Sequence, residues 1–123
     1  MKSGQLIIAA ASVAEAATGL GLVAVPSLVV GLLLGAEPEG IAIVLSRVAG
    51  IALISLAIAC WPDGDTKRAG GSYFGMLLYN ALVALLLLSV GIGGEATGAL
   101  LWPVVLLHGI FSALLAWAQL REL

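Results

Sequence analysis

Residues 5–25 read QLIIAAASVAEAATGLGLVAV, an apolar run with a single carboxylate, Glu15, near its middle. The run is about 20 residues long, the length that an α-helix needs to cross roughly 30 Å of hydrocarbon. It shows no strand-like alternation, and backbone groups cannot stay unpaired in lipid, so it predicts a membrane-spanning helix. An ionisable side chain in the middle of a membrane span costs free energy unless it has a partner, and it is therefore a candidate functional residue.

The composition of the whole chain agrees with that interpretation. Of its 123 residues, 62% are hydrophobic and only 10% are charged, and the mean hydropathy is +1.18. These values lie far outside those of a soluble globular domain and predict an integral membrane protein. The sequence has no basic stripe interleaved with aromatic residues, so nucleic-acid binding is excluded. The single cysteine, Cys60, excludes an internal disulfide and a cysteine-based metal cluster.

Proline, glycine and acidic residues divide the chain into four apolar segments of about 20 residues each. We therefore expect an all-α fold, a four-helix bundle in the membrane that forms one domain over residues 1–123. The expected spans are 5–25, 41–61, 71–90 and 97–119.

The stretch SLVVGLLLG, which follows Pro26, is too short to span a membrane and too apolar for an aqueous loop. It predicts a short interfacial or re-entrant segment after the first span. The alternative is a first helix that is kinked at Pro26 and continues to Gly35; it would be about 45 Å long and strongly tilted. We favour the break.

The basic residues predict the orientation of the spans. One side of the membrane receives Lys2, Lys67, Arg68 and Arg121, whereas the loops on the other side carry Glu37, Glu39 and Glu95. By the positive-inside rule both termini are cytoplasmic, and we expect a multi-pass protein of the bacterial inner membrane. A cleaved signal peptide is the alternative for the first segment, but a carboxylate in the middle of its apolar region fits poorly.

Each expected span contains one strongly polar side chain. Counting 1.5 Å per residue places Glu15, Asn80 and His108 about 14 to 16 Å from the nearer end of their spans, close to the midplane. Arg47 is shallower, at about 9 to 10 Å from the outer end. Uncompensated charge at the bilayer centre costs at least about 2.5 to 3.5 kcal/mol, so these four groups are expected to turn inward and meet.

Several interpretations of this polar layer stay open. Glu15 and Arg47 are either a structural ion pair or part of a working site. Asn80 is typical of an interhelical hydrogen bond, and His108, without another His or Cys nearby, is more typical of a hydrogen-bonded core residue than of a metal ligand. We expect no metal and no cofactor. Three further residues extend the candidate site: Thr18, Ser55 and Tyr79.

No catalytic motif is present: the sequence has no nucleophile elbow, no carboxylate pair spaced for glycoside or di-metal chemistry, and no glycine-rich phosphate loop that joins a strand to a helix. We therefore expect no enzyme and no catalytic residues.

Two resemblances can be drawn from the sequence. A first span ending at Pro26, the short SLVVGLLLG segment, SRVAGIALISLAIACW in the second span and PVVLLHGIFSALLAW in the fourth resemble the DoxX-like small four-helix bacterial membrane proteins. That resemblance implies architecture and no defined activity. AAASVAEAATGLGL resembles the first helix of the small multidrug resistance exporters, in which a membrane-embedded glutamate binds protons and cationic drugs.

The expected function is binding of a small polar or amphipathic ligand, such as a quinone or a lipid, at the polar layer, or service as an accessory subunit of a membrane complex. The alternatives are a proton-coupled exporter that works as a homodimer through Glu15, and a purely structural assembly partner. The buried Arg47 expected here would repel a cation and argues against the exporter.

Overall fold

A computed structural model of the chain describes residues 2–64 and 66–122, and the side chains of all of these except 66–69 and 122. The described residues form five helices joined by loops, in the order α1 (Ser3–Ala24), α2 (Pro26–Leu34), α3 (Ile41–Ala59), α4 (Thr66–Ile92) and α5 (Leu101–Glu122). The side chains of Lys67 and Arg68, which carry part of the orientation argument, lie outside the described residues.

Among the described residues, four helices are long and apolar enough to cross a membrane, which confirms the expected all-helical bundle of four long segments. They are Ser3–Ala24, Ile41–Ala59, Gly70–Ile92 and Leu101–Arg121. The distribution of side chains is the reverse of that in a soluble protein: Leu85 and Leu86 are more than 60% exposed, whereas Glu15 and Asn80 are at most 2% exposed. These features indicate a multi-pass membrane protein.

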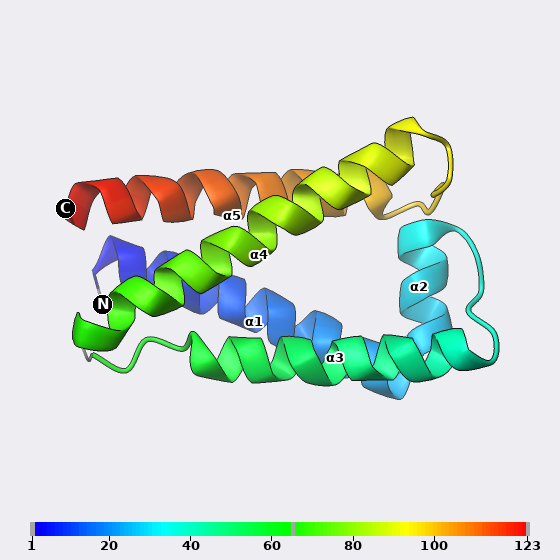
Figure 1. Cartoon of the computed structure of the whole chain (residues 1–123), viewed down its shortest axis with the longest axis horizontal. Coiled ribbons are helices and arrows are strands. Elements are labelled where there is room, and N and C mark those ends of the chain that lie inside the picture. Colours follow the sequence, from blue (N-terminus) through cyan, green and yellow to red (C-terminus); the bar gives the residue numbers. More distant parts are fainter. Residues whose placement is uncertain (1, 65, 123) are drawn as a thin grey trace.

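The long helices pack in two pairs, α1 with α3 and α4 with α5, and α1 also contacts α5. In Figure 1, α4 runs diagonally across the molecule, and the two chain termini lie at the same end. The α1–α3 pair is very close at Gly19 and Gly50. A Cβ atom built on either glycine would lie 2.6 Å from the carbonyl oxygen of the other, so neither position has room for a side chain.

The chain breaks before Pro26, as expected, and the following segment is a separate short helix. Val25 leaves the helical conformation (φ −136°, ψ 60°), and Pro26 starts α2, where its missing N–H costs no hydrogen bond. The helix ends at Gly35, whose φ of 79° is the left-handed conformation that glycine adopts easily. Figure 1 shows α2 lying across the end of the molecule opposite the termini.

The last long helix starts at Leu101 rather than at Thr97. The residues between them bond to α2 instead: the backbone N–H of Thr97 donates to the Leu34 carbonyl (3.0 Å) and that of Leu100 donates to the Leu32 carbonyl (2.8 Å). These bonds satisfy carbonyls that the end of a helix leaves unpaired. The segment 97–100 therefore anchors α2 to the bundle.

Two apolar clusters form the core. One lies towards the termini and includes Ile8, Met76 and Leu115; the other lies towards α2 and includes Leu87 and Leu101. A buried polar residue lies between the two clusters in the sequence of each of two helices: Asn80 on α4 and His108 on α5.

Candidate functional site: a buried polar layer

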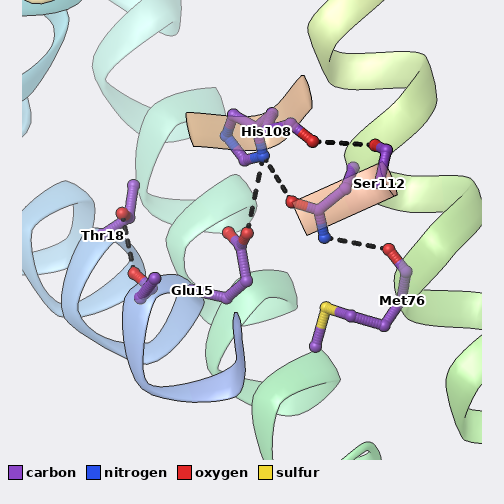
Figure 2. A network of polar contacts seen from close by, with 7 residues as sticks. Glu15, Thr18, Met76, His108 and Ser112 are labelled. Atoms are coloured by element: carbon purple, nitrogen blue, oxygen red, sulfur yellow. Dashed lines mark hydrogen bonds and ion pairs between the residues drawn. The ribbon is translucent and has the colours of Figure 1, made fainter. Parts of the chain in front are cut away.

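The polar layer is formed by α1, α4 and α5, between the two apolar clusters. α1 contributes Glu15, α4 contributes Asn80 and α5 contributes His108, which are 2%, 0% and 8% exposed. Figure 2 shows the Glu15 carboxylate directed towards the His108 ring. Three of the four residues that the depth count selected therefore meet, and they do so where the two helix pairs face each other.

Asn80 and His108 are joined by a short hydrogen bond, the interhelical bond expected for Asn80. The amide nitrogen of Asn80 donates to the Met76 carbonyl (2.9 Å), so its Oδ1 faces His108 Nδ1 at 2.7 Å. Because Oδ1 can only accept, Nδ1 must carry the proton of this bond. His108 Nε2 is then the acceptor nitrogen of the neutral ring and the atom that would take up a second proton.

Glu15 is held less tightly than Asn80. Its Oε1 lies 3.7 Å from His108 Nδ1, a distance that suits an ion pair only when the imidazole is protonated. The Tyr79 hydroxyl interacts with the same carboxylate, and the Tyr79 ring meets the His108 ring edge-on, with centroids 5.9 Å apart. A carboxyl group and an imidazole in this arrangement can share, hold or pass on a proton.

Arg47, the expected fourth member, does not join the layer. Its side chain is exposed on α3. The crossing at Gly19 and Gly50 explains the separation, because α1 and α3 run in opposite directions there. Glu15 lies four residues before the crossing on α1, and Arg47 lies three residues before it on α3. Because the two helices are antiparallel, these offsets lie on opposite sides of the crossing and add to about 10 Å along the bundle axis.

Of the three residues expected to extend the site, only Tyr79 does so. Thr18 donates its hydroxyl to the Ala14 carbonyl (2.9 Å) and Ser55 donates to the Ile51 carbonyl (2.9 Å), and both side chains are exposed. These are ordinary bonds within a single helix, and they satisfy hydroxyl groups that face away from the bundle.

The sequence did not single out Ser12, which lies one helical turn before Glu15. Ser12 is 1% exposed, and its Oγ has no hydrogen-bond partner. It lines a cavity of about 820 Å³ between α1, the end of α3 and the start of α4. The sequence feature that could have identified Ser12 is its spacing of three residues from Glu15, which puts both side chains on the same face of α1.

Cys60 lines the same cavity, just after the end of α3. Its thiol contacts the Ser72 carbonyl at 3.5 Å, and burial raises the pKa of this thiol above its usual value. Among the described residues, no three His, Cys, Asp or Glu side chains gather into a set that could hold a metal ion.

Comparisons with known proteins identify no counterpart of this site. No protein-family model, no curated protein and no solved structure matches the chain.

Proposed function

We propose that the chain is a membrane protein that binds a small polar or amphipathic molecule at the layer of Glu15, Asn80 and His108, with Glu15 as the group that exchanges a proton. The observation that carries this proposal is a carboxyl group, 2% exposed and 3.7 Å from an imidazole, inside a bundle of apolar helices. A layer built only for stability would be better served by an apolar packing of the same volume. Ionisable residues within a membrane-spanning bundle are typically functional.

Isotope-edited infrared spectroscopy tests the proton exchange directly. In proteoliposomes moved from alkaline to acidic buffer, loop carboxylates such as Glu37, Glu39 and Glu95 also become protonated. The wild-type protein should show, besides their band, a C=O stretch at the higher frequency of a carboxyl group shielded from water, and that band should be missing in Glu15→Gln. The matched control is Ser55→Ala, which alters a hydroxyl outside the layer and should keep the signal. A wild-type spectrum identical to that of Glu15→Gln across the titration would contradict the proposal.

The proposed location is the bacterial inner membrane, with both termini in the cytoplasm. Figure 1 shows the termini at one end of the bundle, Lys2 and Arg121 are next to them in sequence, and four spanning helices return the chain to its starting side. A fluorescent protein fused to the C-terminus should mature, and alkaline phosphatase fused there should stay inactive. The DoxX-like resemblance rests on the sequence around Pro26 and His108 and stays a proposal about architecture.

A proton-coupled exporter is the second candidate, because the exposed position of Arg47 removes the objection to it. The expected objection was that a buried guanidinium would repel a cationic substrate, but Arg47 is exposed and about 10 Å from Glu15 along the bundle. This mechanism requires a dimer that encloses a pathway. Proteoliposomes with an imposed proton gradient should then move tetraphenylphosphonium, a lipophilic cation, and Glu15→Gln should abolish the movement.

A further inference from the structure

The cavity near the termini is lined by one face of α1. The lining residues of that helix recur at helical spacing from Lys2 to Ala16, which corresponds to about 20 Å along the axis. The other walls come from residues 57–60 at the end of α3, from the loop that follows, and from Ser72 and Tyr73 at the start of α4. Its volume of about 820 Å³ is within the range of pockets that hold small ligands.

One wall of the cavity is shared with the outer surface of the bundle. Val13 and Ile58 both line the cavity, and they are 56% and 73% exposed. In a membrane such exposed apolar side chains face acyl chains. The cavity therefore borders the surface that faces acyl chains, which is the side from which a molecule dissolved in the bilayer would approach it.

Ser12 lines this apolar cavity, and its hydroxyl group is covered by neighbouring atoms, so the side chain has to turn about its Cα–Cβ bond to reach a ligand there. Most hydroxyl groups within the long helices donate to a carbonyl of the preceding turn, as Ser46, Ser55 and Ser112 do. Ser12 makes no such bond, although its Oγ is buried. A buried hydroxyl without a partner costs free energy, which a ligand that accepts its hydrogen bond would recover.

We propose that this cavity binds an uncharged single-chain amphiphile whose carbonyl or hydroxyl oxygen accepts a hydrogen bond from Ser12. The chain would lie along Val13, Ala16 and Ile58. The charged residues among its described lining, Lys2 and Asp63, lie towards the end with the termini and have opposite signs. An uncharged head avoids the cost of carrying a charge to the depth of Ser12. This inference names the ligand class of the proposed function and rests on it, because the bound head lies one turn from Glu15.

Photolabelling tests the proposal. A long-chain fatty alcohol carrying a diazirine is added to the protein in proteoliposomes, and the labelled peptides around the cavity are quantified by mass spectrometry. Loss of one neutral hydrogen bond in Ser12→Ala should reduce labelling about 2- to 10-fold. Ser55→Ala, which removes a hydroxyl on the outer face of α3, should label like the wild type. A diazirine hydrocarbon without a head group should label the wild type and Ser12→Ala equally.

Filling the cavity gives a second variant. Ala16→Phe should reduce labelling by the alcohol, while gel filtration and circular dichroism report that the helices have folded. Equal labelling of wild type and Ser12→Ala by the alcohol would overturn the proposal. So would stronger labelling by the corresponding fatty acid that is lost in Lys2→Gln, because that result means an anionic head at the opposite end. The infrared titration of Glu15 is unaffected by either result, so failure here is distinguishable from failure of the proposed function.

Discussion

The hydrogen bond between His108 and Asn80 should make a measurable contribution to folding. Replacing Asn80 with alanine leaves His108 Nδ1–H with no acceptor closer than Glu15 at 3.7 Å, and replacing His108 leaves Asn80 Oδ1 without its donor. Each single substitution should lower the free energy of unfolding by about 1 to 3 kcal/mol, because a buried polar group loses its partner.

The double mutant isolates the interaction itself. Interhelical hydrogen bonds in membranes contribute about 0.6 kcal/mol on average and about 1.7 kcal/mol at most. At 2.7 Å between two side chains that are at most 8% exposed, this bond should lie in the upper half of that range. The double mutant Asn80→Ala/His108→Ala should therefore be about 1 to 1.7 kcal/mol more stable than the sum of the two single effects predicts.

The assay is reversible unfolding by SDS in mixed micelles, followed by far-ultraviolet circular dichroism. The control cycle pairs Asn80→Ala with Ser55→Ala, whose side chain is exposed on another helix, and it should be additive within about 0.5 kcal/mol. An Asn80–His108 cycle that is equally additive would mean that the two groups do not interact in the folded protein.

Three further predictions concern the helix crossing, the outer face and the cavity. Gly50→Ala should destabilise the protein by about 1 to 3 kcal/mol in the same assay, because the new Cβ would meet the backbone of α1. Gly109→Ala should not destabilise it in this way, because a Cβ at that position would meet no neighbouring atom. Equal effects of the two substitutions would contradict the close helix crossing. Arg47→Gln should change the free energy of unfolding by no more than about 0.5 kcal/mol, and a larger loss would mean that it has a buried partner. Cys60 should react slowly with maleimide in the folded protein and faster as the pH rises, because burial keeps its thiol protonated; rapid labelling at neutral pH would contradict its buried position.

The spans and the depth of the polar layer follow from local properties of the chain. Length and hydropathy determine which segments can cross a membrane, and residue counts along each helix place Glu15, Asn80 and His108 at similar depths. The break at Pro26 follows from the missing N–H of proline. These features need no knowledge of how the helices pack.

The features that depend on packing were harder to predict. Arg47 has the positive charge that a partner of Glu15 would need. The crossing at Gly19 and Gly50, however, sets the rotation and height of α3 and leaves Arg47 outside the polar layer. The late start of α5 depends on hydrogen bonds to α2, a contact between distant segments. The cavity beside Ser12 depends on how α1, α3 and α4 are placed at one end of the bundle, which no single helix encodes.

The function proposed for this chain requires that the Glu15 carboxyl on α1 and the His108 imidazole on α5 meet inside the membrane. The chain has a single histidine, so ¹⁵N-histidine labelling reports on His108 alone. Solid-state NMR of the protein in lipid bilayers, with ¹³C-labelled glutamate, measures the dipolar coupling between a glutamate carboxyl carbon and that ring. A coupling should be present in the wild type, disappear in Glu15→Gln and persist in Arg47→Gln. A wild-type spectrum without the coupling would contradict this arrangement.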